Sequence, residues 1–357
     1  MIYFVTVDIT KVGGIERSLS SLCSELVAQK SSVTIISCFK SHPQAQFSFP
    51  GVKIQYLQDG DANFINSGLG YKLVKYAKTF FRLRSFFEKS DRGVVVSVYP
   101  MLSIMMTFFI KQEVHKLYGW EHSQFFGHSW LLNSARKLFY YKLKGLFVLT
   151  ELEKKSYLGC RVGIRVLPNP IELVSFDRKT SEEPKIIFVG RMSSEKCPEK
   201  FVMIMDSFRN IFGSQFSARM YGSGALESCI RSLISDLDLD TNIELISDCT
   251  DQSIIYDADA FVSTSETEVF GIALVEAMGH GLVTFASYLC NGPNQLIKHR
   301  KNGFLVNVDD SPAVASLMVE ILNDKKAALE ISDSARANYK QYSPTVIART
   351  LLGYLNE

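Results

Sequence analysis

Long hydrophobic runs are missing from this sequence. The longest, residues 101–110, is about half the length that crosses a bilayer. The apolar opening at residues 2–7 stops at Asp8 and has no basic segment before it, unlike a secretory leader. We therefore expect a protein without a membrane-spanning segment, which is cytoplasmic or peripheral on a membrane.

Paired cysteines are also missing. The seven cysteines are odd in number and form no Cys-x-x-Cys pair. This pattern predicts neither a disulfide framework nor a structural zinc site, and it favours a reducing compartment. The sequence also lacks the cluster of Asp and His that a catalytic metal needs, so no metal is expected.

A third absence is the dinucleotide fingerprint Gly-x-Gly-x-x-Gly. The loop at residues 11–17 reads KVGGIER, and the second expected strand ends at Cys38 without an acidic residue. A Rossmann dehydrogenase needs both features, so that class is disfavoured. The loop does contain Gly13 and Gly14, which let the backbone approach a phosphate closely. A Gly-Gly pair also makes an ordinary turn from strand to helix, so this signal is weak alone.

What is present is a globular composition with two electrically opposite halves. The 357 residues are 46% hydrophobic and 21% charged, which suits two domains of ordinary size. Residues 1–168 hold 22 Lys and Arg against 11 Asp and Glu, a net charge of +11. Residues 169–357 hold 17 against 26, a net charge of −9. We expect the two halves to meet different partners.

Short apolar runs alternate with helical patterns along both halves. Strands are expected at 2–7, 33–38, 53–57, 93–98, 114–118 and 145–150, and again at 185–189, 216–221, 243–246, 260–264, 282–286 and 303–306. Helices are expected at 15–30, 69–89 and 130–142, and near 198–212, 224–236, 271–280 and 311–323. Such alternation indicates parallel, doubly wound sheets, here in two copies.

The fold class is therefore α/β, with two facing Rossmann-like domains and a central cleft between them. Prolines and a polar run interrupt both patterns in the middle of the chain. We place an N-terminal domain at 1–168, a linker at 169–184, a C-terminal domain at 185–342 and a last helix at 343–357.

The strongest candidate site follows the expected strand 260–264. A helix begins near Gly271, and the N–H groups of Phe270, Gly271 and Ile272 would form an anion site at its N-terminus. Glu268 lies just before this end, and Glu276 lies about a turn and a half along the helix. Their carboxylates can accept hydrogen bonds from hydroxyl groups on either side of a bound phosphate. Alternatively, Glu268 only favours the helix dipole and Glu276 is a surface residue.

A loop with two cations follows the first strand of the second half. Arg191 and Lys196 lie five residues apart directly after the expected strand 185–189. Fixed cations beside a leaving diphosphate lower the reaction barrier, because negative charge accumulates there. Two solvated cations in a loop would look the same, and the nearby Glu-x₇-Glu pattern favours the site.

The helix at 69–89 has a basic side. Its apolar residues recur at helical spacing and predict a face toward the core. Basic residues project on the opposite side, with Phe81 and Phe86 beside them; these are Lys72, Lys75, Lys78, Arg82 and Lys89. This pattern fits an ordinary solvated face or a surface that contacts anionic lipid. The net charge of +11 on residues 1–168 favours membrane contact.

The Glu-x₇-Glu pattern, with Phe-Gly after the first Glu and Ala-Met after the second, resembles a known signature. It is similar to the donor site of the retaining GT-B glycosyltransferases of glycosyltransferase family four, or glycosyl transferases group 1. The similarity covers most of the chain and is strongest over 185–306. It implies a GT-B fold, Glu268 on the donor sugar, Glu276 on the ribose, and a retained anomeric configuration.

The cationic loop resembles the diphosphate clamp of the same family, Gly-Arg-x₄-Lys. The resemblance implies that Arg191 and Lys196 hold the diphosphate of the donor. The chain departs from the family pattern at two positions where Gly is common, Cys197 and Val269. A side chain at Val269 would narrow the sugar pocket, and this departure weakens any inference about the sugar.

The resemblance extends to weaker signals elsewhere. The pair Gly13 and Gly14 resembles the family's loop over the donor phosphates. His122, in the run Trp-Glu-His-Ser, is similar to a histidine that reaches the sugar, although a lone His is more often a structural hydrogen-bonding residue. The Asn-Gly-Pro turn at 291–293 is similar to one in members that build bacterial surface polysaccharides.

These features predict transfer of a hexosyl unit from a nucleoside diphosphate sugar, UDP-linked by resemblance, to a hydroxyl group. The expected acceptor is a lipid-linked glycan for bacterial O-antigen, capsule or lipopolysaccharide, at the inner face of the cell membrane. No cofactor, metal or nucleic-acid partner is expected. Two alternatives stay open: a nucleotide-sugar epimerase of the same fold, which needs a paired acid and base, and a catalytically silent carbohydrate-binding subunit. Slow release of nucleoside diphosphate without acceptor would mark an enzyme and argue against the silent subunit.

Overall fold

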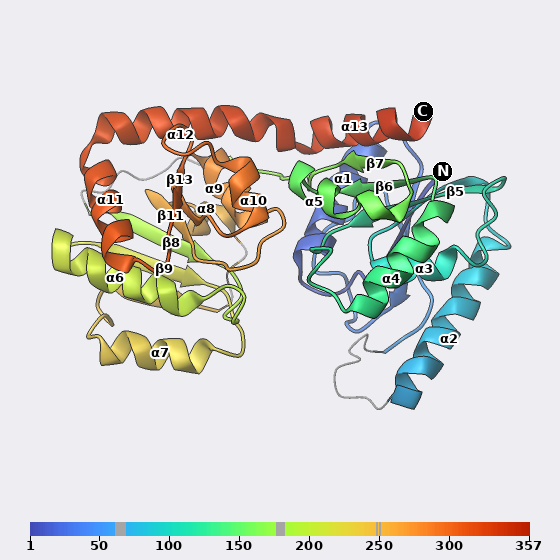
Figure 1. Ribbon diagram of the computed structural model, residues 1–357, viewed down its shortest axis with the longest axis horizontal. Helices are drawn as coiled ribbons and strands as arrows, with labels where there is room; N and C mark the ends of the chain where they lie inside the picture. The colour runs from blue at the N-terminus through green and yellow to red at the C-terminus, as the bar shows by residue number, and fades with distance from the viewer. Residues whose placement is uncertain (61–68, 176–182, 248, 250) are drawn as a thin grey trace. The chain divides into compact units, whose positions relative to one another are not determined.

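The computed structural model describes residues 1–60, 69–175, 183–247, 249 and 251–357, with the side chains of 69–73 also left out. The chain divides into two compact units. The N-terminal unit comprises Met1–Pro170 and Pro344–Glu357, and the C-terminal unit comprises Ile171–Ser343. Residues 176–182 of the expected linker lie outside the described part of the chain. Each unit is built around a parallel sheet (Figure 1).

The N-terminal unit has a seven-stranded parallel sheet in the order β3-β2-β1-β4-β5-β6-β7. Apolar and β-branched side chains make these strands, and β1 and β2 are buried along almost their whole length. The strands are β1 (Ile2–Asp8), β2 (Val33–Phe39), β3 (Lys53–Tyr56), β4 (Gly93–Ser97), β5 (His115–Glu121), β6 (Gly145–Val148) and β7 (Ile164–Val166).

Helices cover this sheet. They are α1 (Gly14–Ala28), α2 (Leu69–Phe87), α3 (Pro100–Met106), α4 (Trp130–Phe139), α5 (Glu151–Ser156) and α13 (Pro344–Asn356). Tyr3 and Val5 of β1 belong to the core beneath α2 and α3, together with Leu83 and Leu102. The last helix, α13, packs beside α1, and Tyr354 stacks on Phe147 of β6. The C-terminal helix therefore belongs to the first unit, although the chain reaches it after the second sheet.

The C-terminal unit has a six-stranded parallel sheet in the order β10-β9-β8-β11-β12-β13. Its strands are β8 (Lys185–Val189), β9 (Ser217–Tyr221), β10 (Ile243–Ile246), β11 (Ala260–Ser263), β12 (Val283–Ser287) and β13 (Phe304–Val306). Its helices are α6 (Pro198–Phe212), α7 (Glu227–Asp236), α8 (Gln252–Ile255), α9 (Ile272–His280), α10 (Asn291–Leu296), α11 (Ser311–Asn323) and α12 (Lys325–Tyr339). One continuous core joins α6 and α11 to the strands.

Both sheets reverse their order at the same place. The chain winds from the first strand to the third on one side, then crosses to the fourth strand on the other. In doubly wound sheets, ligands bind outside the carboxyl ends of the two strands that flank this switch point. These strands are β1 and β4 in the N-terminal unit, and β8 and β11 in the C-terminal unit.

The expected fold class of two Rossmann-like α/β domains is confirmed, and each expected strand and helix is found within a few residues of its predicted bounds. The helix expected at 130–142 ends at Phe139 and continues as a short 3₁₀ turn, Tyr140–Lys142. Five helices and the edge strand β7 were missed: α3, α5, α8, α10 and α12. Among the described residues, no helix is both long and apolar enough to span a bilayer.

Candidate functional site

The loop after β8 carries Arg191 and Lys196 and rests on a second loop. Met192 N–H donates to the Ser223 carbonyl at 2.9 Å, in the loop that follows β9. A Cβ atom on Gly222 or Gly224 would overlap the backbone of residues 190–192, so only glycine fits at both positions. Sequence reasoning missed this support, although Gly-x-Gly directly after a strand was a signal for it.

Lys196 and Glu268 form an ion pair between the loops that follow β8 and β11. Both side chains are partly buried. The Thr264 hydroxyl donates to the Lys196 and Cys197 carbonyls at 2.8 and 2.9 Å, which ties the two loops together. Two predicted site residues, 72 positions apart in sequence, thus meet at the switch point of the C-terminal sheet.

Arg191 is held less firmly than Lys196. Its side chain is 74% exposed and pairs with Glu195 at 2.7 Å. A third cation on the same edge, Lys200, pairs with Glu266 at 3.0 Å and with Asp309 at 2.8 Å. Lys196 is therefore the cation fixed beside the predicted sugar-binding carboxylate, while Arg191 can swing.

The N-terminus of α9 begins where the sequence predicted. Gly271 has φ +92° and ψ +71°, a left-handed conformation that favours glycine, and it turns the chain into the helix. The N–H groups of the first helical turn have no acceptor within the helix, and the helix dipole makes this end positive. Gly271 is the cap of this end, Ile272 is its first helical residue, and Phe270 directly precedes the cap. It can bind an anion such as a phosphate.

The Asn-Gly-Pro turn supports the same loop. Gly292 N–H donates to the Glu268 carbonyl at 2.9 Å. A Cβ atom on Gly292 would lie 2.5 Å from the Phe270 carbonyl oxygen, so a larger residue would push the loop away. The turn, at the start of α10, thereby fixes the backbone that carries Glu268.

Glu276 is buried, with 2% of its surface exposed, so the alternative that it is a surface residue is wrong. Its carboxylate accepts hydrogen bonds from the Tyr256 hydroxyl at 2.6 Å and from Gln252 Nε2 at 3.2 Å. Gln252 Nε2 also donates to the Glu172 carbonyl at 3.0 Å. These partners from α8 and the following turn hold the carboxylate in one orientation, and sequence reasoning did not identify them.

In the N-terminal unit, Gly13 and Gly14 lie in the loop after β1, where α1 begins. The Glu16 carboxylate folds back over this loop, and a Cβ atom on Gly13 would lie 2.6 Å from Glu16 Oε2. Glu16 is 5% exposed. Burial raises its pKa to about 7, with Asp8 adding to the rise. A buried acid thus lies in the first turn of α1, at the switch point of the N-terminal sheet, where sequence reasoning named only the neighbouring glycines.

His122 directly follows β5. Its ring lies 4.3 Å from the Trp120 ring, centroid to centroid, and the buried Nε2 atom has no hydrogen-bond partner among the described residues. Burial lowers the pKa of His122 to about 3, so the ring is neutral. The preceding residue, Glu121, is a buried anchor that pairs with Arg136 at 2.9 Å. His122 therefore offers a neutral ring nitrogen without a partner, whereas Glu121 is structural.

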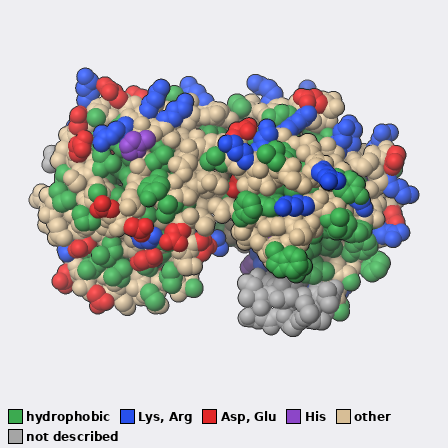
Figure 2. All heavy atoms as spheres, viewed as in Figure 1, with side chains coloured by type: hydrophobic (Ala, Val, Ile, Leu, Met, Phe, Trp, Pro, Cys, Tyr) green, Lys and Arg blue, Asp and Glu red, His purple; other side chains and the backbone are tan. Residues whose placement is uncertain are grey.

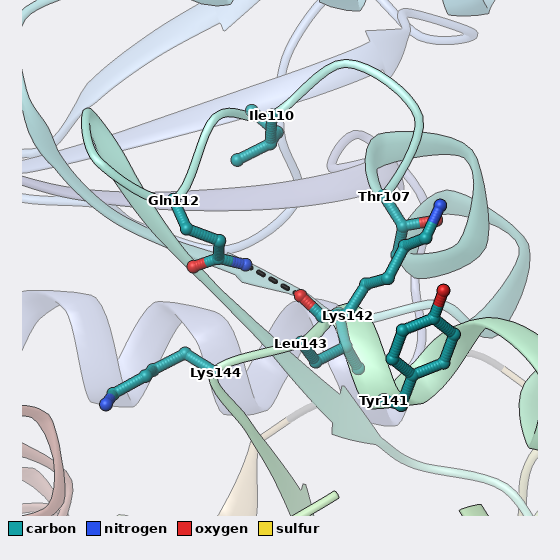
Figure 3. Close-up of a pocket in the computed structure, with 7 residues that line it drawn as sticks. All are labelled: Thr107, Ile110, Gln112, Tyr141, Lys142, Leu143 and Lys144. Carbon is teal, nitrogen blue, oxygen red and sulfur yellow. Dashed lines mark hydrogen bonds between the residues drawn. The ribbon is translucent and has the colours of Figure 1, made fainter.

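A separate pocket of about 500 Å³ lies in the N-terminal unit (Figure 3). Its lining comes from the segments that follow α3 and α4 and contains none of the predicted site residues: Thr107, Ile110, Gln112, Tyr141, Lys142, Leu143 and Lys144. Gln112 Nε2 donates to the Lys142 carbonyl at 2.8 Å across it. In the described part of the chain, no three His, Cys, Asp or Glu side chains gather as metal ligands would.

Comparison with known families agrees with the geometry of the C-terminal unit. Residues 172–338 match the model of the glycosyl transferases group 1. The chain is 23% identical over 350 residues to the α-1,4-N-acetyl-D-galactosaminyltransferase of Campylobacter jejuni that acts on GalNAc-α-(1→4)-GalNAc-α-(1→3)-diNAcBac-PP-undecaprenol. That alignment covers 97% of this chain and 95% of the relative.

Solved structures share the fold over the whole chain. A sucrose-phosphate synthase from Thermosynechococcus elongatus is similar with a TM-score of 0.84 at 18% identity, over 99% of this chain and 98% of that one. A mutant of TarM from Staphylococcus aureus, solved with fondaparinux, α-GlcNAc-glycerol and UDP, is similar with a TM-score of 0.81 at 16% identity. That likeness covers 100% of this chain and 99% of the TarM chain.

Proposed function

We propose that the chain is a glycosyltransferase, whose residues 172–338 match the glycosyl transferases group 1, and that it moves a hexosyl unit from a nucleoside diphosphate sugar to a hydroxyl group. The ion pair between Lys196 and Glu268 carries this proposal. It places a cation and a carboxylate at the switch point, beside the N-terminus of α9. This arrangement suits a donor whose diphosphate and sugar lie next to each other.

The leaving diphosphate would take its stabilisation from three sources. Lys196 is fixed beside Glu268, and exposed Arg191 can move toward the phosphates. The N–H groups of Phe270, Gly271 and Ile272 add fixed dipoles. Negative charge that develops on the diphosphate is then stabilised by groups already in place. Such electrostatic stabilisation is usually the largest single contribution to the rate enhancement of an enzyme. We propose that no metal is required, because these protein groups supply the positive charge.

The carboxylates would orient the rest of the donor. Glu268 accepts from sugar hydroxyls, and Glu276, held by Tyr256 and Gln252, accepts from ribose hydroxyls. In the N-terminal unit, the unpartnered Nε2 of His122 is suited to a sugar hydroxyl, and the Gly13-Gly14 loop to a phosphate. The likeness to family four supports retention of the anomeric configuration, and UDP in the solved TarM relative supports a UDP-linked donor.

We propose a lipid-linked glycan of bacterial surface polysaccharide synthesis as the acceptor, met at the inner face of the cell membrane. The Campylobacter relative acts on an undecaprenol-linked glycan, and the N-terminal half of this chain has the positive net charge that an anionic membrane or lipid diphosphate would attract. Binding of an anionic membrane by the N-terminal unit is part of this proposal.

A panel of nucleotide sugars tests the donor. A ligand present at about a hundred times its dissociation constant stabilises the folded protein by roughly 2.7 kcal/mol, which a thermal melt detects. The stabilising donor is then incubated without acceptor. Slow release of nucleoside diphosphate supports the transferase, whereas stabilisation without any release leaves a carbohydrate-binding subunit.

The carboxylates are tested by Glu268→Ala and Glu276→Ala. Loss of a carboxylate that accepts from a buried hydroxyl should lower kcat/KM by about 1–3 kcal/mol of transition-state binding. Because Glu276→Ala also leaves Tyr256 without its acceptor, Tyr256→Phe serves as the control for that structural loss. Activity within about twofold of wild type for both Ala variants would reject the assignment.

A further inference from the structure

Exposed apolar side chains are concentrated on one part of the N-terminal unit, the stretch from α3 to α5. Large hydrophobic residues are more than half exposed there: Phe108, Phe126, Trp130, Leu131, Leu138 and Tyr141. Single exposed apolar residues are common on proteins, but neighbouring ones in a soluble protein mark an interaction surface.

Helix α4 and the turn after it arrange four of these residues as one stripe. Trp130, Leu131, Leu138 and Tyr141 are 74%, 61%, 62% and 57% exposed. Leu131, Leu138 and Tyr141 follow Trp130 by one, eight and eleven residues, and at helical spacing these positions lie on the same side. The opposite side already packs on the core through Leu132, Ala135 and Phe139. The stripe is thus an apolar face that the fold of the unit does not use.

Basic residues lie beside this stripe. Residues 122–150 contain Lys137, Lys142 and Lys144 and no Asp or Glu, while the remaining cation of this stretch, Arg136, is buried and pairs with Glu121. Lys142 Nζ lies 5.3 Å from the centre of the Phe108 ring and 5.7 Å from that of Phe139, which brings its charge to the edge of the apolar residues.

The surface views agree with this distribution. Figure 2 shows hydrophobic and basic side chains intermixed where Figure 1 draws α4. Lys142 lies beside Tyr141 at the pocket of Figure 3, and Lys144 also lines this pocket but points away from Tyr141. An amphipathic helix with Trp and Leu on one side and lysines at the border is suited to lie in a lipid interface.

We propose that this surface, defined by Trp130, Leu131, Leu138, Tyr141 and the adjoining Lys137 and Lys142 and called here the α4 face, docks on an anionic lipid bilayer. The proposal rests on the proposed function, in which the acceptor is reached at a membrane, and it names the residues that make the contact. An apolar stripe with lysines beside it matches acyl chains below anionic headgroups.

The basic side of α2, which the sequence favoured, is less suited to this contact. Lys75 Nζ lies 5.6 Å from the centre of the Phe39 ring, and Arg82 donates to the Leu57 carbonyl and the Gln58 side chain. Arg82 is therefore held by hydrogen bonds of the protein itself, and the Lys72 side chain lies outside the described residues. The contact of Lys75 with a ring does not separate the two helices, because Lys142 makes the same kind of contact. Val74 and Phe81 of α2 are also exposed, at 65% and 64%, but the α4 face has four such residues together with Lys137 and Lys142.

Tryptophan fluorescence tests the contact directly. The chain has two tryptophans, Trp130 on the α4 face and Trp120, which is 1% exposed in the core. With vesicles of phosphatidylcholine and phosphatidylglycerol (7:3) in low salt, emission should shift to shorter wavelength as Trp130 enters the interface. The shift should be absent with pure phosphatidylcholine, absent in Trp130→Phe, and reversed by added salt.

Flotation with the same vesicles measures binding. The double variant Leu131→Gln with Leu138→Gln should lower vesicle binding on the order of tenfold, because two leucines that would be buried in the lipid interface are lost. The matched control is Ile211→Gln with Leu329→Gln, two leucine-sized residues of similar exposure on helices of the C-terminal unit, and it should bind as wild type does. Release of nucleoside diphosphate without vesicles, together with thermal melts, should be unchanged in both variants.

Three outcomes would overturn the proposal. Equal flotation of the Leu131/Leu138 variant and wild type would place lipid binding on another surface. Recovery of wild type in the soluble fraction with both vesicle types would reject a lipid partner. If sedimentation finds dimers of the wild type and monomers of the variant, the partner of the α4 face is a second copy of the chain. Because nucleoside diphosphate release is measured without vesicles, each result is independent of whether the proposed transferase activity holds.

Discussion

The two units share a sheet topology and differ in the chemistry placed at the same edge. In the C-terminal unit, the loops after β8 and β11 carry Lys196, Glu266 and Glu268, which form ion pairs among themselves and with Lys200 at the start of α6. In the N-terminal unit, the first turn of α1, which follows the loop after β1, carries Glu16, a buried acid with a pKa raised to about 7. The edge of the C-terminal sheet therefore carries ionised side chains in pairs, whereas the edge of the N-terminal sheet can hold Glu16 in its protonated, neutral form.

The difference teaches that local charge, not net charge, decides what an edge can bind. Residues 169–357 have a net charge of −9, yet they carry the fixed lysine and the helix N-terminus proposed for a diphosphate. Residues 1–168 have a net charge of +11, yet their switch point is lined by a buried acid. Unit-wide charge acts over longer distances, on the approach to a membrane, and it is screened within about 10 Å at moderate salt.

The largest expected effect comes from removing the fixed charge of the C-terminal edge. Lys196→Ala should lower kcat by about 10²–10³, as expected for the loss of one group that meets developing charge. Steady-state kinetics with the stabilising donor measure it, and KM should change less than kcat. Arg191→Ala should have a smaller effect, because that side chain is exposed.

Lys200→Ala is the matched control for this prediction. Lys200 lies on the same edge and pairs with Glu266 and Asp309, so it tests whether any cation there suffices. Its removal should leave kcat near the wild-type value. A rise in KM alone for Lys196→Ala would show that Lys196 only holds the ground state, and an equal loss of kcat for both lysines would reject the special role of the pair with Glu268.

The buried carboxyl group of Glu16 should make the N-terminal unit less stable as pH rises. Folded Glu16 keeps its proton up to about pH 7, whereas the unfolded chain loses it near pH 4.5. The contribution of this group to the free energy of unfolding is therefore full below about pH 4.5 and is lost as pH rises through 7. A shift of this size corresponds to about 3 kcal/mol. Among the groups that face this carboxyl group, Asp8 adds to the rise of its pKa, whereas Tyr99 and Lys11 oppose it.

Glu16→Gln isolates this contribution. Buried His122, with its pKa lowered to about 3, gives the opposite slope up to about pH 6.5, so only the difference between wild type and the variant is informative. Both tryptophans, Trp120 and Trp130, lie in this unit, and their fluorescence during urea unfolding reports its stability. The wild type should lose stability relative to the variant between pH 4.5 and 8. A difference that stays constant with pH contradicts the assignment.

The sequence was sufficient for the fold because the fold is local and periodic. Alternating strands and helices can be predicted from neighbouring residues, and this alternation predicted both parallel sheets. Misses occurred where the local pattern was weak. α12 is polar, although the N-cap Asp324 accepting from Lys326 and Ala327 N–H was a start signal. α3 begins at Pro100, a favoured first helical position, inside a stretch noted only for its apolar character.

The site was predictable residue by residue but not as a constellation. Lys196 and Glu268 were each named, yet their ion pair joins loops 72 residues apart. The partners of Glu276 come from another segment, and no pattern links Tyr256 to it. Burial explains the other gap: Glu16 follows the glycines that were named, but its acid is unusual only because folding removes it from water.

The smallest expected effect concerns Cys197, where the family commonly has glycine. Cys197 has φ +47° and ψ +54°, and this left-handed conformation costs a residue with a side chain about 1–2 kcal/mol. Cys197→Gly removes that strain but loses the contact of the thiol with the Ser194 carbonyl at 3.0 Å. Glycine also makes the unfolded chain more flexible, which lowers the free energy of unfolding by about 0.5–1 kcal/mol. Cys197→Ala loses the same thiol and keeps the strain. Calorimetry should therefore find the Gly variant about 1 kcal/mol more stable than the Ala variant, with kcat close to wild type in both, because the Lys196 side chain is unchanged. Equal stability of the two variants would mean that the backbone conformation at 197 does not explain the preference for glycine.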